Sequence, residues 1–88
     1  MTAYVYIVEC ADGTLYTGWT KDLEKRIDAH NAGGGAKYTR SRRPVTLRYY
    51  ETFEEKCEAL RRECALKKYT HAEKIALIES GVVVDNED

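Results

Sequence analysis

Five polar side chains in this sequence could together hydrolyse a phosphodiester bond. The reaction needs an activated water, positive charge beside the phosphate and stabilisation of the leaving oxygen. Groups suited to these tasks occur in the order Tyr6, Tyr16, Arg26, His30 and Glu63. A phenol serves as a base only where cations or a metal lower its pKa, which is about 10 in model peptides. Arg26, a basic segment and a bound cation could supply that field.

Each of these residues also has an ordinary structural explanation. Tyrosines often half cover the face of a sheet, and arginines on helices are usually solvated. His30 falls on the apolar side of its predicted helix, where packing is a common role for histidine. Glu63 could pair with Lys67 four residues later, although Mg²⁺ is often held by one or two carboxylates with water and phosphate. The joint arrangement, rather than any one residue, therefore indicates chemistry.

The hydrophobic pattern places these groups on strands and helices. Alternation typical of β-strands occurs over residues 3–9, 14–19 and 45–50. Helical periodicity and capping signals predict helices over residues 21–32, 52–69 and 70–80. The order β-β-α-β-α-α predicts a three-stranded, mainly antiparallel sheet flanked by helices, an α/β (α+β) fold.

The turn between the first two strands decides which tyrosines share a face. A three-residue loop at 11–13, with Gly13 in the left-handed conformation of a G1 bulge, would pair Tyr6 with Gly18. Tyr6 and Tyr16 then point the same way, whereas a two-residue turn would put them on opposite faces. We predict the three-residue loop. Gly18 then leaves space beside the Tyr6 ring, because it has no side chain.

Local signals mark the ends of the three predicted helices. Thr20 is a good N-cap for the first helix, and Gly33 follows its last turn. The sequences Thr52–Glu55 and Thr70–Glu73 match capping boxes and would open the other two helices. The middle helix would bury an apolar stripe made of Phe53, Cys57, Leu60 and Cys64.

One segment is strongly basic, although the chain as a whole carries a net charge of −1. Residues 31–50 contain no acid and five cations, which are Lys37, Arg40, Arg42, Arg43 and Arg48. The part that follows the connector Gly33–Ala36 reads as irregular and exposed. Its cations predict a surface that grips nucleic-acid phosphates without reading base sequence, and Tyr38 among them could stack on an unpaired base.

Length and composition limit the remaining possibilities. The 88 residues predict one domain, over residues 1–80, followed by an acidic C-terminal tail, 81–88. No apolar run approaches the roughly 20 residues of a membrane span, and no signal peptide precedes the first strand, so we expect a cytoplasmic protein. Disulfides and a zinc site are not expected, because the odd number of cysteines forms no paired motif. We expect buried, reduced side chains at Cys10, Cys57 and Cys64.

In combination, these motifs resemble the GIY-YIG nuclease superfamily. The triplets Tyr4-Val5-Tyr6 and Tyr16-Thr17-Gly18 look like its paired signature, and the resemblance covers residues 3–78. The run GGGAKYTR, followed by RRP, further resembles the short stand-alone type found in bacteria and archaea, the YhbQ/YazA-like proteins. The chain departs from the signature in having tyrosine rather than glycine at its start and threonine rather than isoleucine in the second triplet.

The resemblance implies roles for three positions on the hairpin. Tyr6 would activate the attacking water, as a general base or through hydrogen bonds. Tyr16 would orient the water or the phosphate, and Gly18 would keep the pocket open. The two departures leave both tyrosines and the glycine intact.

The resemblance also implies roles for three residues on the helices. Arg26 would hold the phosphate, His30 would assist proton transfer or bind phosphate, and Glu63 would hold one Mg²⁺ or Mn²⁺ at the leaving oxygen. Several members of the family place an asparagine after this glutamate. Residues 64–80 contain none, so that phosphate contact is either missing or replaced by Lys67 or Lys68.

The resemblance predicts a metal-dependent nuclease that hydrolyses DNA, either structure-directed or indifferent to sequence, with a role in repair as one use. A second reading is a nucleic-acid-binding module that keeps the fold with little or no catalysis. A third is an adaptor whose partner is a protein. We expect DNA rather than RNA as the nucleic acid, and a protein partner could supply the specificity that this short chain lacks.

Overall fold

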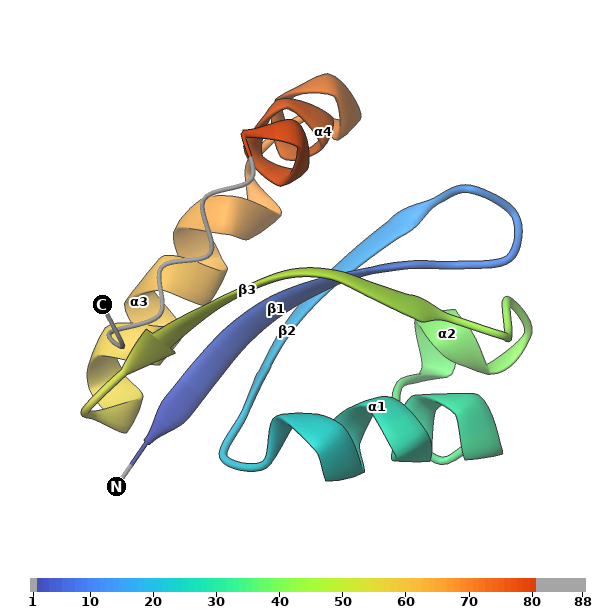
Figure 1. Ribbon diagram of the computed structural model, residues 1–88, viewed down its shortest axis with the longest axis horizontal. Coiled ribbons are helices and arrows are strands. Elements are labelled where there is room, and N and C mark those ends of the chain that lie inside the picture. The colour runs from blue at the N-terminus through green and yellow to red at the C-terminus, as the bar shows by residue number, and fades with distance from the viewer. Residues whose placement is uncertain (1, 81–88) are drawn as a thin grey trace.

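A three-stranded antiparallel sheet forms the centre of the computed structural model, which describes residues 2–80 (Figure 1). The strands are β1 (Ala3–Glu9), β2 (Leu15–Thr20) and β3 (Thr46–Phe53). Their order in the sheet is β2-β1-β3, so both outer strands pair with β1. The predicted acidic tail lies outside the described residues.

Helices pack against both faces of this sheet, which confirms the predicted fold class. They are α1 (Leu23–Ala32), α2 (Lys37–Arg40), α3 (Lys56–Lys67) and α4 (His71–Glu79). Apolar side chains of α1 pack on the face that carries Tyr6 and Val8. Apolar side chains of α3 pack on Val5, which points to the opposite face. Within the described residues no helix is long and apolar enough to cross a membrane.

The hairpin has the predicted register. Tyr6 pairs with Gly18 and Val8 with Tyr16, so both tyrosines lie on the face covered by α1. Gly13 has a φ of 85°, in the left-handed region that favours glycine. Its N–H donates to the carbonyl of Cys10 at 2.9 Å, which closes the turn.

Two predicted helix starts are wrong, because strand pairing continues further than local signals indicate. Thr20 pairs with Tyr4 in β2, and Asp22 is the N-cap of α1. Thr52 also pairs with Tyr4, within β3, so the capping box at Thr52–Glu55 does not form. The helix α3 begins at Lys56 instead. Ladder hydrogen bonds to β1 satisfy the backbone that a cap would otherwise satisfy.

The capping box of α4 is confirmed. The Thr70 hydroxyl accepts from the N–H of Glu73 at 3.1 Å, and the Glu73 carboxylate accepts from the N–H of Thr70 at 2.8 Å. No strand competes for this backbone, so the local signal decides the structure.

The predicted buried stripe of the middle helix is wrong in its orientation. Cys57 and Cys64 are exposed, and only Cys10 among the cysteines is buried. The face of α3 that meets the sheet carries Ala59 and Leu66 instead, which have no exposed surface. Alanine lets the helix approach the sheet closely, and the helix therefore turns its cysteines to solvent.

The segment predicted to be irregular contains the short helix α2. The N–H groups of Thr39 and Arg40 donate to the carbonyl of Ala36 at 3.2 and 3.1 Å. The connector before it is not a free linker, because Gly35 packs against the His30 ring. This turn of helix stands beside α1, on the α1 side of the sheet (Figure 1).

Candidate active site

The Tyr6 hydroxyl is the centre of a buried polar cluster. Tyr6 lies in the middle of the sheet, beneath α1, and has no exposed surface. Its oxygen is 2.8 Å from His30 Nε2, and His30 is also fully buried. Arg26 Nε donates to the same oxygen at 3.3 Å. Arg26 and His30 are one helical turn apart, so α1 presents both to the strand below.

Burial sets the protonation of Tyr6. It raises the pKa of the phenol, and the hydrogen bond and charge of Arg26 offset only part of that rise. The charges of Tyr16 and Glu63 raise the pKa further. Tyr6 is therefore a neutral phenol near pH 7, with a proton that it can donate.

Burial has the opposite effect on the charged form of His30. It lowers the pKa of the imidazole below its ordinary value of about 6.5, and the charge of Arg26 lowers it further. His30 is therefore neutral near pH 7, and one ring nitrogen carries a free lone pair. A neutral imidazole beside a neutral phenol can receive the proton of that phenol.

The two remaining hairpin positions complete the cluster. The Tyr16 ring meets the His30 ring edge-on, with 5.4 Å between centroids. A Cβ atom at Gly18 would lie 2.5 Å from the Tyr6 oxygen and 2.7 Å from Cζ of the same ring. Glycine is thus the residue that leaves the hydroxyl in place, and the predicted reason for Gly18 agrees with the geometry.

Glu63 forms no hydrogen bond, ion pair or ring contact with this cluster within the described residues. It comes from α3, and its side chain is 15% exposed. Its carboxylate lies 3.5 Å from Lys67 Nζ, the neighbour four residues later. Its negative charge is nevertheless among the causes that raise the pKa of Tyr6.

The residues present fit a sparsely held hard cation. Residues 2–80 contain no group of three or more histidine, cysteine, aspartate or glutamate side chains arranged to hold a metal. That donor set excludes a closed structural zinc site in this part of the chain. One carboxylate suits Mg²⁺ or Mn²⁺, because such ions keep water and substrate phosphate as their other ligands. Glu63 could hold such an ion.

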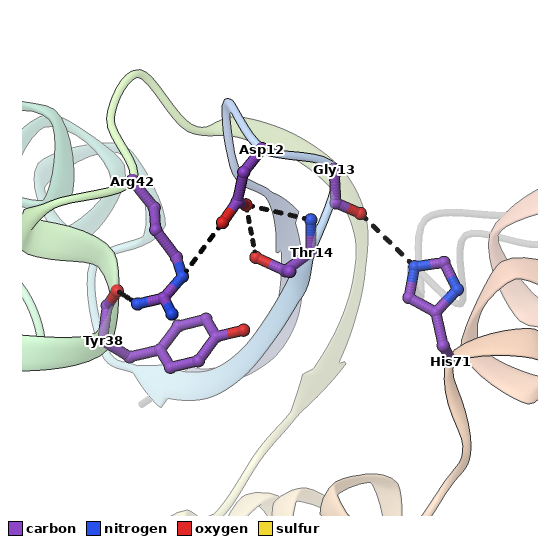
Figure 2. A network of polar contacts seen from close by, with 6 residues as sticks. All are labelled: Asp12, Gly13, Thr14, Tyr38, Arg42 and His71. Carbon is purple, nitrogen blue, oxygen red and sulfur yellow. Dashed lines mark hydrogen bonds and ion pairs between the residues drawn. The ribbon is translucent and has the colours of Figure 1, made fainter.

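Three arginines of the basic segment make contacts within the protein, and Figure 2 shows those of Arg42. Arg48 donates to the Glu9 carboxylate at 2.6 Å. Arg42 Nε donates to the Asp12 carboxylate at 3.1 Å, and its guanidinium lies 4.0 Å from the centre of the Tyr38 ring. Arg43 donates to the carbonyls of Arg40 and Asn31, at 2.9 and 3.4 Å. These contacts fix the segment against the hairpin turn and the end of α1.

Lys37 and Arg40 are the freer cations of the segment. Both side chains are exposed, and neither forms a hydrogen bond or ion pair with another described residue. Tyr38 is 38% exposed and stacks on Tyr16, with 5.8 Å between centroids and 23° between ring planes. Tyr38 therefore extends the tyrosine cluster outward, with Arg42 on its ring.

The hairpin turn is held from two sides. The Asp12 carboxylate accepts from the N–H and hydroxyl of Thr14, at 3.1 and 2.6 Å, as well as from Arg42. On the other side of the turn, His71 Nε2 donates to the Gly13 carbonyl at 3.3 Å (Figure 2). The turn thus links the basic segment to the start of α4.

Sequence reasoning missed one polar residue of the cluster. Thr39 is fully buried, and its hydroxyl oxygen is 2.8 Å from His30 Nδ1. A threonine among exposed cations carries no signal of burial in a single sequence. The glycine run before it was the available signal, because Gly35 lets the chain close over the imidazole.

A groove of about 700 Å³ lies on the other flank of α1, between this helix and β3. Apolar side chains and two tyrosines line it, together with one cation, Lys21, and three acids, Asp22, Glu24 and Asp28. None of the six predicted catalytic residues lines it. Its acidic rim disfavours phosphate, so we place the candidate site at the Tyr6 cluster rather than in this groove.

The family model of the GIY-YIG catalytic domain matches residues 2–76. This chain belongs to the GIY-YIG family. Membership places it in a superfamily of nucleases, which act on nucleic acids and generally depend on a divalent metal. The resemblance predicted from the two tyrosine triplets is confirmed.

Relatives of this GIY-YIG chain match along most of their length. A UPF0213 protein of Clostridium perfringens is 61% identical over 77 residues, which are 88% of this chain and 83% of the relative. A UPF0213 protein of Halobacterium salinarum is 57% identical over 74 residues, 84% of this chain and 96% of the relative. The predicted stand-alone type is therefore confirmed. The name UPF0213 designates a family and no reaction.

Two solution structures share the fold. A UPF0213 protein from Bacillus halodurans is 46% identical, with a TM-score of 0.58 over 90% of this chain and 84% of its own. A protein from E. faecalis is 41% identical, with a TM-score of 0.62 over 91% of this chain and 85% of its own. The arrangement of sheet and helices is thus that of the family.

Proposed function

We propose that this GIY-YIG domain is a metal-dependent nuclease that hydrolyses phosphodiester bonds in DNA. The observation that carries the proposal is the buried contact between the Tyr6 hydroxyl and His30 Nε2, with Arg26 on the same oxygen. Burying the polar groups of Tyr6 and His30 is costly unless they satisfy one another, and the part-buried Arg26 adds a donor to the same oxygen. Their arrangement can accept a proton at one end and hold an anion at the other.

In this proposal Tyr6 and His30 move the proton of the attacking water. Because its pKa is raised, Tyr6 is protonated near neutral pH and is not a tyrosinate before the reaction. As water attacks phosphorus, the Tyr6 oxygen takes the water proton and passes its own proton to His30 Nε2. His30 leaves this step as an imidazolium, and it can return the proton after the leaving oxygen departs. General acid–base transfer of this kind typically contributes 10²–10⁴-fold.

Arg26 is placed to exchange its hydrogen bond to Tyr6 for hydrogen bonds to a substrate phosphate. Its hydrogen bond to Tyr6 is long, at 3.3 Å, and a guanidinium binds phosphate more strongly through two parallel hydrogen bonds. We infer that a bound phosphate draws Arg26 toward it and exposes the Tyr6 hydroxyl to water. The same charge then stabilises the transition state.

Glu63 would hold the divalent cation, Mg²⁺ or Mn²⁺. When bound, such an ion neutralises charge that develops on the leaving oxygen. Lys37 and Arg40 would grip the phosphates on either side of the cleaved bond, without reading base sequence. The substrate would then be selected by shape, such as a single strand or a distorted duplex, rather than by sequence.

Cleavage of end-labelled DNA tests the proposal. The full chain would be incubated with single-stranded, duplex and branched DNA, and with matching RNA, in Mg²⁺, Mn²⁺ or EDTA. We expect metal-dependent cleavage of DNA that falls by about 100-fold in Glu63→Gln and persists in Glu58→Gln, an exposed acid on the same helix. Equal cleavage in EDTA would contradict the role of the metal.

A second function, a nucleic-acid-binding module without catalysis, is favoured by the pairing of Glu63 with Lys67. A carboxylate that stays paired with a lysine is not free for a cation. Under this reading the chain would retain DNA equally in Mg²⁺ and EDTA, and Glu63→Gln would change nothing. Salt-sensitive binding with no cleavage in any metal would establish it in place of the nuclease.

A further inference from the structure

We propose that Thr39 is a positioning residue that fixes the proton of neutral His30 on Nδ1, leaving Nε2 as the acceptor for Tyr6. Neutral imidazole has two tautomers, and the hydrogen bond at one nitrogen decides which nitrogen is free. The hydrogen bonds at both ring nitrogens therefore decide which nitrogen carries the proton. The network here is constrained at both ends.

At the outer end, the Thr39 hydroxyl has its hydrogen committed elsewhere. It donates to the carbonyl of Ala36 at 3.1 Å, and a carbonyl can only accept. A hydroxyl carries one hydrogen, so with that hydrogen on the carbonyl the Thr39 oxygen accepts, from His30 Nδ1 at 2.8 Å and from the N–H of Ala36 at 3.4 Å. Nδ1 therefore carries the proton. Thr39 is fully buried, so no solvent water competes for this contact.

At the inner end, the Tyr6 hydroxyl leads to the same assignment. Its oxygen accepts from Arg26 Nε, and its hydrogen needs an acceptor because the side chain has no exposed surface. Among residues 2–80, His30 Nε2 is the acceptor within reach, at 2.8 Å. Both ends give the same direction of donation. Arg26 donates to Tyr6, and Tyr6 donates to His30. His30 then donates to Thr39, which donates to the Ala36 carbonyl.

The other tautomer would break the chain of donors at Tyr6. A proton on Nε2 would be donated to the Tyr6 oxygen, which already accepts from Arg26. The phenol hydrogen would then have no partner in the described interior, and an unsatisfied buried donor is costly. Tyr6 could no longer pass a proton to His30, so the assignment of the tautomer decides whether the relay exists.

The backbone around Thr39 serves this contact. A Cβ atom at Gly35 would overlap Nδ1 and Cα of His30, so glycine lets the connector cross the imidazole. The short helix α2 then turns Thr39 inward while its neighbours Tyr38 and Arg40 stay at the surface. The basic segment thus has two sides. On its inner side Thr39 contacts His30, and on its outer side Lys37 and Arg40 are proposed to bind DNA.

Two substitutions separate the hydroxyl from the shape of the side chain. Thr39→Val keeps the shape and removes the acceptor, whereas Thr39→Ser keeps the acceptor and removes a methyl group. The first readout is ¹⁵N NMR of the His30 ring in the full chain, because protonated and unprotonated ring nitrogens have well-separated shifts. We expect a protonated Nδ1 in the wild type and in Thr39→Ser, and a shift toward protonated Nε2 in Thr39→Val. An unchanged ring spectrum in Thr39→Val would overturn the proposal.

The consequence for rate rests on the proposed nuclease activity. We expect kcat to fall about 10- to 100-fold in Thr39→Val with KM nearly unchanged, and Thr39→Ser to recover most of the loss. A tautomer shift without a fall in kcat would overturn the catalytic part of the proposal. A wild-type chain that cleaves nothing would contradict the nuclease, while the NMR result would still decide the tautomer. Thermal melting of both variants excludes loss of the fold as the cause.

Discussion

At the scale of single residues, a glycine covers each partner of the Tyr6–His30 hydrogen bond. Gly18 faces the phenol oxygen, and Gly35 faces the imidazole. The role of Gly18 could be predicted, because strand alternation and the loop length fix its place opposite Tyr6. The role of Gly35 could not, because it depends on how the connector folds back onto α1. Thr39 was missed for the same reason.

Gly18→Ala should therefore be destabilising and inactivating. The added methyl group would lie 2.5 Å from the Tyr6 oxygen, so the ring must move away from His30. Overpacking of this kind typically costs about 1–3 kcal/mol. Urea denaturation measures the loss, with Gly34→Ala as control, because its nearest neighbour is a carbonyl at 3.9 Å. A variant as stable as the control would contradict the close packing.

The lowered pKa of His30 predicts how stability changes with pH. The folded chain keeps the imidazole neutral, so the unfolded chain binds more protons once the pH falls below about 6.5. The free energy of unfolding should therefore fall between pH 7 and pH 5.5. His30→Gln should lessen this dependence, and His71→Gln, at an exposed histidine, should leave it in place. Equal slopes in all three proteins would show that His30 is not buried as a neutral group.

At the scale of elements, a buried acid fastens α3 to the sheet. Glu51 of β3 accepts from Arg62 Nε and a terminal nitrogen of the same guanidinium, at 2.9 and 3.0 Å. The Tyr49 hydroxyl donates to the same carboxylate at 2.6 Å. This network holds the helix that carries Glu63, the next residue. Sequence reasoning missed it, because no local pattern shows that a charge on a strand and one on a helix will meet.

Arg62→Met should cost more stability than any surface change on this helix. The substitution leaves Glu51, which is 5% exposed, with a buried charge and one remaining donor. Breaking a buried pair costs about 3–5 kcal/mol, and we expect the lower value because Arg62 is 32% exposed. Arg61→Met, at the exposed neighbour, provides the matched control in chemical denaturation. Similar losses in both variants would contradict the role of the pair.

The elements could be predicted where local chemistry decides them. Alternation and the turn at Gly13 determine the hairpin register, and the Thr70 capping box determines the start of α4. Predictions failed where the structure of a segment is decided by residues that are distant in sequence and pair or pack with it. Tyr4 draws both Thr20 and Thr52 into strands, and the packing of α3 leaves its cysteines in solvent. These are effects of tertiary pairing that override a cap or an apolar stripe.

At the scale of the whole molecule, the basic segment is divided between support and binding. Arg42, Arg43 and Arg48 are occupied by contacts within the chain, whereas the exposed side chains of Lys37 and Arg40 have no such contact among the described residues. The sequence predicted the presence of a basic surface but could not assign these separate roles. A cation already paired with a carboxylate or carbonyl contributes less to phosphate binding than a free one.

The double variant Lys37→Ala, Arg40→Ala should bind DNA more weakly and with a smaller salt dependence. Each lost phosphate contact should reduce the slope of log affinity against log salt by about one. Fluorescence anisotropy over a range of salt concentrations measures both quantities. The double variant Lys25→Ala, Arg61→Ala, at two exposed positions outside the basic segment, removes the same two positive charges and controls for net charge. An unchanged slope in the double variant would move the binding surface elsewhere on the protein.

The proposed mechanism requires the buried Tyr6 hydroxyl to move a proton during phosphodiester hydrolysis. The most direct measurement is single-turnover cleavage of labelled DNA in Mg²⁺ by the wild type, Tyr6→Phe and Tyr4→Phe. Tyr4 is the matched control, because it lies on the same strand and face outside the cluster. We predict a loss of about 100-fold or more in Tyr6→Phe and wild-type rates in Tyr4→Phe. Cleavage by Tyr6→Phe at the wild-type rate would contradict the account.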